Sequence, residues 1–142
     1  MKKIISILLF CLFLVGCTDF EYTEKVEISK DDFIASCVEH TYDDLARYPD
    51  KYKNDHVKFK GKVMQVLESG NNYIEMRINV TQGKYSWDDT IYCAYNYSND
   101  EAKILEDDII TFYGTYNGTV TYTAVLGNKI TVPCVIIQFI DR

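Results

Sequence analysis

Hydrophobic and polar positions alternate with a period of two over most of the chain after residue 56. The clearest run is residues 73–81, where Ile74, Met76, Ile78 and Val80 are separated by polar side chains and a tyrosine precedes them. Side chains on a strand point alternately to two faces, so this period predicts strands with one buried and one solvated face. Five strands are predicted in this way, at residues 56–68, 73–81, 90–97, 109–125 and 130–140.

Glycine, asparagine and proline interrupt three of these strands. Gly61 predicts a bulge or sharp bend in the first strand, and the largely apolar residues 63–67 beyond it predict that both faces become covered there. The Asn-Gly pair at residues 117–118 is a hairpin-turn signal, so the fourth strand is expected to be a hairpin of two arms. Pro133 places the start of the last strand at an edge or a bulge.

Two short helices are predicted ahead of the strands. Ser29 with Asp32, and Thr41 with Asp44, have the three-residue spacing of a capping box. The second helix is expected to run to Arg47. The first is expected to bury one face made of Phe33, Ile34, Cys37 and Val38.

The number and order of these elements predict the fold class. A glycine-bent first strand and a single helical turn, capped by Ser98, between the third and fourth strands indicate a mainly β protein. We expect a five-stranded Greek-key barrel of the OB type with one or two short N-terminal helices. A polar loop over residues 82–89, which contains Trp87, is expected to join the second and third strands. An immunoglobulin-like sandwich would need about seven strands.

The first 17 residues have a different pattern. Two lysines precede an almost wholly apolar run at residues 4–15, which Gly16 and Cys17 close. This order is typical of a targeting segment, and the run is shorter than the roughly 20 apolar residues of a membrane-spanning helix. The closing Leu-Val-Gly-Cys resembles the lipobox of bacterial lipoproteins. The resemblance implies that residues 1–16 are removed and that Cys17 carries a diacylglyceryl group.

This interpretation sets the domain organisation and the location. We expect residues 17–28 to be a lipidated N-terminus and tether, and residues 29–142 to form the barrel with its helices. Two acyl chains are enough for stable anchoring, so the expected location is the extracytoplasmic face of the cell membrane, and the membrane is an expected partner.

Charge argues against nucleic acid as a ligand. The chain has 15 Lys and Arg residues against 21 acids, and two of these lysines lie in the targeting segment, which leaves 13 against 21, or −8. Neutralisation of phosphates by Lys and Arg dominates nucleic-acid affinity. We therefore expect a protein, peptide or glycan ligand instead.

Three cysteines follow the anchor, without the C-x-x-C spacing of a zinc site. With only His40 and His56 to join Cys37, Cys93 and Cys134, no metal site is predicted. The thiols are either small buried hydrophobic groups or include one disulfide, which an extracytoplasmic location permits. Cys93 and Cys134 are then the favoured pair, because both lie in strand-like runs.

No motif for catalysis accompanies the two histidines, so we expect no enzyme and no cofactor. A metal-dependent nuclease-like OB enzyme is the alternative, and it would need arginines to clamp phosphate. Only Arg47, Arg77 and Arg142 follow the targeting segment. A passive structural role in the envelope is a further alternative.

A binding face is predicted on the second and third strands, because OB barrels present ligands to that face and its flanking loops. Cross-strand tyrosines are also ordinary sheet stabilisers, so a purely structural role for these side chains stays open. The candidate ligand-binding residues are Tyr73, Arg77, Tyr85, Trp87, Tyr92 and Asn96, with Glu75 and Asn79 between them.

Three sequence runs are similar to one family. They are LARYPDKYKNDHVKFKGKVMQVLE, ILEDDIITFYGTYNG and ITVPCVIIQFI. They resemble the small OB-fold lipoproteins of Gram-positive bacteria, which are grouped by fold with tRNA-anticodon-binding-like OB domains. The resemblance extends from about Ser36 to the C-terminus and implies the fold but no activity. The chain departs from the pattern at Asn54-Asp55, where a glycine often stands, and at Cys93 and Cys134.

Overall fold

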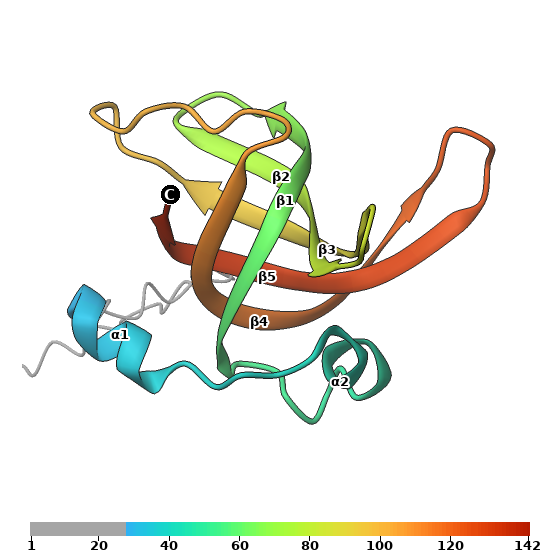
Figure 1. The fold of residues 1–142 in the computed structure, drawn as a ribbon, viewed down its shortest axis with the longest axis horizontal. Helices are drawn as coiled ribbons and strands as arrows, with labels where there is room; N and C mark the ends of the chain where they lie inside the picture. The colour runs from blue at the N-terminus through green and yellow to red at the C-terminus, as the bar shows by residue number, and fades with distance from the viewer. Residues whose placement is uncertain (1–27) are drawn as a thin grey trace, which may run out of the picture.

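The computed structural model describes residues 28–142 (Figure 1), so the predicted targeting segment, Cys17 and nearly all of the predicted tether lie outside the described residues. The elements, in chain order, are α1 Lys30–Ser36, α2 Tyr42–Arg47, β1 His56–Glu68, β2 Tyr73–Gln82, β3 Trp87–Asn96, β4 Ile109–Thr123 and β5 Lys129–Asp141.

The five strands form a closed barrel in the order β1-β2-β3-β5-β4. β1 closes it by pairing with β4 along residues 56–62 and with β2 along residues 62–68. β3 and β5 are parallel, and the other pairs are antiparallel. The fold is therefore mainly β and of the predicted OB type. The barrel interior is filled by apolar side chains from every strand, including Val57, Ile78, Ile91, Phe112 and Val135.

The barrel closes through two glycines. A Cβ at Gly61 would lie 2.6 Å from Cγ2 of Ile78 and 2.7 Å from the carbonyl oxygen of Asn79. A Cβ at Gly114 would lie 2.5 Å from the carbonyl oxygen of Ile136. Real Cβ atoms essentially never come this close, so only glycine lets β1 approach β2, and β4 approach β5, at these points.

The bulge in β1 lies beyond Gly61, between Val63 and Gln65. The extra residue reverses the face on which the following side chains lie. Leu67 is consequently exposed on the outside of the barrel, and Met64 is exposed as well because it continues the outward face of Lys58 and Lys60. The prediction that both faces are covered here is wrong for these two residues.

The turn predicted at residues 117–118 is a bulge. β4 continues through these residues, its register with β5 shifts between Tyr116 and Thr119, and Gly118 has φ +79°. Pro133 pairs with Thr119 beside this bulge, as its predicted position requires. The β4–β5 turn is residues 124–128, close to the gap between the predicted fourth and fifth strands, and Ala124 N–H donates to the Asn128 carbonyl there at 2.8 Å. Figure 1 shows the resulting β4–β5 hairpin projecting beyond the barrel.

The two helices begin at the predicted caps. Ser29 caps α1, but α1 ends at Ser36, so the predicted apolar face fails at Val38, which is exposed and instead bridges to Val57. α1 buries only Phe33.

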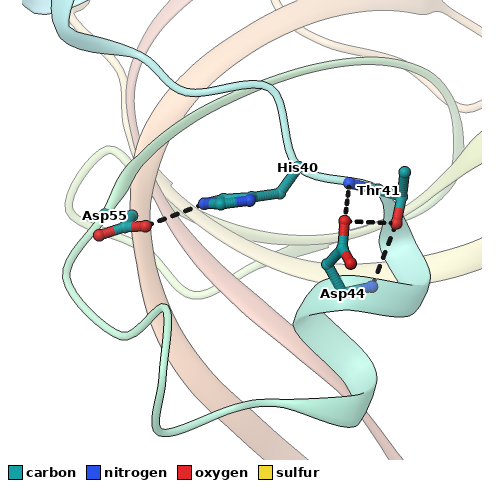
Figure 2. Close-up of polar contacts among 4 residues, drawn as sticks. All are labelled: His40, Thr41, Asp44 and Asp55. Atoms are coloured by element: carbon teal, nitrogen blue, oxygen red, sulfur yellow. Dashed lines mark hydrogen bonds and ion pairs between the residues drawn. The ribbon is translucent and has the colours of Figure 1, made fainter.

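The reciprocal capping box of Thr41 and Asp44 opens α2 (Figure 2). Hydrogen bonds from Thr41 to the carboxylate lower the pKa of Asp44. The same view shows the imidazole of His40 directed toward Asp55, with Nε2 2.9 Å from Oδ2. α2 is fixed to the barrel from within, because the buried hydroxyl of Tyr116 donates to the Leu45 carbonyl at 2.8 Å.

Two connections differ from their predictions. Trp87 pairs with Gln82, so β3 begins earlier than expected and the turn is confined to residues 83–86. Residues 98–101 form a turn instead of a helical turn, in which Ser98 N–H donates to Glu101 at 3.0 Å.

Cys93 and Cys134 are both buried and free, so they match the first of the two alternatives given for these thiols and not the disulfide. Across the β3–β5 ladder Cys93 pairs with Val135, whereas Cys134 pairs with Tyr92. Because adjacent residues on a strand point to opposite faces, Cys93 points into the barrel and Cys134 lies on the side of Tyr92. Burial raises the pKa of both thiols.

We expect Gly61→Ala to destabilise the protein by about 1–3 kcal/mol, because the methyl group must displace the β2 backbone. Urea unfolding followed by far-UV circular dichroism measures the change. Lys60→Ala, at the exposed neighbouring position on β1, is the control and should change stability by less than about 0.5 kcal/mol. Equal stability of Gly61→Ala and wild type would contradict the assigned close approach.

Candidate ligand groove

A groove of about 600 Å³ lies on the outside of the barrel, between the face of β1–β3 and the β4–β5 hairpin. Its barrel side is made of residues from three strands, and its other side is the tip and inner face of the hairpin. We call it the hairpin groove. It is lined by Gln65 and Leu67 of β1, Arg77 of β2, Tyr92 of β3, and Tyr122, Thr123, Ala124, Val125, Leu126, Asn128 and Ile130 of the hairpin.

Arg77 connects the two sides of the hairpin groove. Its Nε donates to Oε1 of Gln65 at 2.8 Å, and its Nη2 contacts the same oxygen. On the other side, Nη1 lies 3.4 Å from the hydroxyl of Tyr122, and the guanidinium lies over the Tyr122 ring, 5.3 Å from its centre. A cation over an aromatic face is attracted to it, so Arg77 holds the hairpin against the sheet.

Three side chains form a hydrogen-bonded group beside Arg77. The carboxylate of Glu75 accepts the hydroxyl of Tyr92, and it also accepts the hydroxyl of Tyr73 at 3.3 Å. Burial, followed by the bond to Glu75, raises the pKa of Tyr92 far above its usual value. Tyr92 is therefore neutral at physiological pH, and its ring forms part of the groove wall.

A smaller hollow of about 250 Å³ continues from the groove along the barrel. It shares Gln65 and Arg77 with the groove and adds Met64, Asn79 and Thr90. Arg77 thus lies at the junction of a largely apolar groove and a more polar extension.

The structure brings together only part of the predicted binding face. Arg77 and Tyr92 line the groove, and Tyr73 is joined to it through Glu75. Tyr85 is 89% exposed in the β2–β3 turn, and Trp87 lies at the start of β3, so neither lines the groove.

Asn96 lies at a different hollow. This second hollow has a volume of about 580 Å³ and also contains Lys30, Glu101 and Gln138. Oε1 of Gln138 is buried there without a hydrogen-bond partner in the part of the chain that the structure describes.

The groove residues that the sequence pattern missed come from β1 and the hairpin. Val125 and Leu126 are 105% and 89% exposed, so two large aliphatic side chains occupy a turn. An aliphatic pair beside Gly127 is the signal that could have indicated this surface, because turns are usually polar. The gap between the predicted strands at residues 109–125 and 130–140 located this turn correctly, but its side chains were not counted as part of a binding surface.

Both histidines have structural contacts. His56 stacks on Phe33 with ring centres 4.2 Å apart, and its Nδ1 lies 2.6 Å from the hydroxyl of Ser36. His40 pairs with Asp55 and packs against Tyr52. Within residues 28–142, no group of three or more His, Cys, Asp or Glu side chains could hold a metal ion. Over the same residues, no helix has both the length and the apolar character needed to cross a bilayer.

The chain was compared with family models, with curated proteins and with solved structures, and the comparison with solved structures gives matches. No model of a protein family matches the chain. A search of curated proteins also finds no match. Among solved structures, the chain is similar to a mitochondrial single-stranded DNA-binding protein from S. cerevisiae. The similarity covers 63% of this chain and 94% of that chain, with 10% sequence identity and a TM-score of 0.41.

We expect Tyr122→Ala to loosen the hairpin without unfolding the barrel, because the change removes the ring under Arg77. Amide hydrogen exchange over residues 119–123 and 129–132 should accelerate about two- to fivefold, as the loss of an exposed cation–π contact implies. Tyr85→Ala, which removes an exposed tyrosine elsewhere, is the control and should leave these rates unchanged. Acceleration spread evenly over all strands would contradict the role given to Tyr122.

Proposed function

We propose that the protein is a lipid-anchored binding module on the extracytoplasmic face of the cell membrane, which holds its ligand in the hairpin groove. The observation that carries the proposal is the position of this groove. It lies against outward-facing residues of β2 and β3 and beneath the loop between β4 and β5, and OB barrels hold their ligands on this surface.

The anchor is supported by the sequence of the first 17 residues. A charged start, a short apolar run and a closing Leu-Val-Gly-Cys are present in that order. A diacylglyceryl group on Cys17 would bury many CH₂ groups, each stabilising membrane binding by about 0.8 kcal/mol.

The side chains that line the groove support ligand binding as its role in place of catalysis. Arg77 is the one charged residue among those that line it. The remaining side chains are mainly aliphatic or aromatic, which is typical of ligand sites with a few orienting polar groups. A chain of phosphates would meet a single cation there, so we propose a ligand other than nucleic acid.

The anchor is tested by Cys17→Ser in cells fed a fatty acid that carries a clickable label. We expect the label on the protein to be lost, because the variant has no thiol to carry the lipid. Cys37→Ser, which removes a cysteine of the folded domain, should keep the label. Labelled Cys17→Ser protein would contradict the proposed anchor.

The groove is tested by photocrosslinking in intact cells from a reactive amino acid placed at position 126 or position 67. Both positions line the groove, so we expect them to capture the same partner. Position 105, whose leucine is 61% exposed but lies outside the groove, is the control and should not capture it. Equal capture from all three positions, or none from 126 and 67, would contradict ligand binding in the groove.

A further inference from the structure

The walls of the hairpin groove limit what can occupy it. Val125 and Leu126 are almost fully exposed on the hairpin, and Leu67 and Ile130 are exposed beside them. Burial of apolar surface is favourable roughly in proportion to the area removed from water. A ligand that gains from this groove therefore presents apolar groups to these four side chains.

Arg77 favours a ligand that carries a negative charge. Its polar partners, Gln65 and Tyr122, are both neutral. In the described part of the chain it forms no ion pair, and the carboxylate of Glu75 is engaged by the hydroxyls of Tyr73 and Tyr92.

Only three of the five N–H groups of the Arg77 guanidinium point to partners among the described residues. Of its five donors, one on Nε, one on Nη2 and one on Nη1 point to Gln65 and Tyr122. The planar fork of a guanidinium matches the two oxygens of a carboxylate. A ligand with one carboxylate would thus neutralise the single cation of the groove.

The hairpin offers a strand edge as well. β1 pairs with β4 only from Ile109 to Thr115, whereas β5 pairs with β4 as far as Thr123. Within residues 28–142, the arm of β4 at residues 119–123 therefore has a strand neighbour on one side only. An extended peptide can add to such an edge through main-chain hydrogen bonds.

From these three features together, we propose that the groove binds an extended apolar peptide segment of a partner protein, with one carboxylate on Arg77. This inference rests on the proposed function and names the ligand class of the same groove. A glycan would place hydroxyls against aliphatic walls, where unpaired hydroxyls are costly. A nucleic acid would bring repeated phosphates to a chain of formal net charge −6. A fatty acid has the carboxylate and the apolar body but no main-chain amides for the β4 edge.

The test is a titration of the purified full-length protein followed by amide chemical shifts. The probe is a mixture of eight-residue peptides randomised over Val, Leu, Phe, Thr and Ser, with a free C-terminal carboxylate. Parallel titrations use the same mixture as C-terminal amides, chitohexaose, a thymidine oligonucleotide and dodecanoate. We expect the carboxylate peptides to shift residues 67, 77 and 122–130, and amidation to weaken their binding about tenfold, as loss of a charge-assisted contact implies.

Two matched variants complete the test. Leu126→Ser removes an exposed aliphatic wall and should weaken peptide binding about three- to tenfold, whereas Leu105→Ser, exposed outside the groove, should bind as wild type does. Because amidation changes only the ligand, the role of the carboxylate is tested even if an Arg77→Gln variant proves unstable.

Equal binding of carboxylate and amide peptides, or no shift with peptides, would overturn the inference. Binding of chitohexaose or dodecanoate in the groove in place of peptides would also overturn it, but would leave the proposed binding function standing. Binding of the oligonucleotide there would overturn both the inference and the proposal that the ligand is not a nucleic acid. The proposed binding function is contradicted by a separate result, namely that photocrosslinking from positions 126 and 67 captures no partner in cells.

Discussion

Closure of a small barrel requires that neighbouring strands come closer at some points than side chains allow, and the structure depends on the two glycines that permit this. At Gly61 the backbone of β2, and at Gly114 the backbone of β5, occupies the space of a Cβ. Gly61 lies where β1 passes from pairing with β4 to pairing with β2, and Gly114 lies in the β4–β5 ladder. The closed interior then buries aliphatic side chains from all five strands, which supplies the main favourable term for folding.

The candidate groove follows from departures from regular pairing. The bulge after Val63 turns Leu67 outward, and the bulge at residues 117–118 precedes the arm of β4 that leaves the barrel. Bulges bend strands and reorient side chains. Arg77 then joins the two sides through Gln65 and Tyr122. The outward position of Leu67 follows from the first of these irregularities, whereas Arg77 faces outward through the regular alternation of β2.

Local patterns predicted much of the fold. The alternation at residues 73–81 gave the faces of β2 correctly, and the Thr41–Asp44 spacing located the start of α2. Both features are decided by residues close in sequence. The site was harder to predict from the sequence, because Tyr122 and Arg77 are 45 residues apart and come into contact only when the barrel folds. Whether Cys93 and Cys134 pair was left open for a related reason, since the faces on which they lie depend on the β3–β5 register.

The sequence by itself determined that there are five strands, the buried face of β2, the helix caps and the resemblance of the first 17 residues to a lipoprotein signal, because each depends on spacing along the chain. Only the tertiary structure decided that Asn117-Gly118 is a bulge, and that Leu67, Arg77 and Leu126 share one groove. An Asn-Gly pair permits positive φ in a turn and in a bulge alike. The partner strand decides whether the pair forms a turn or a bulge. The path of that strand is fixed only when the barrel closes.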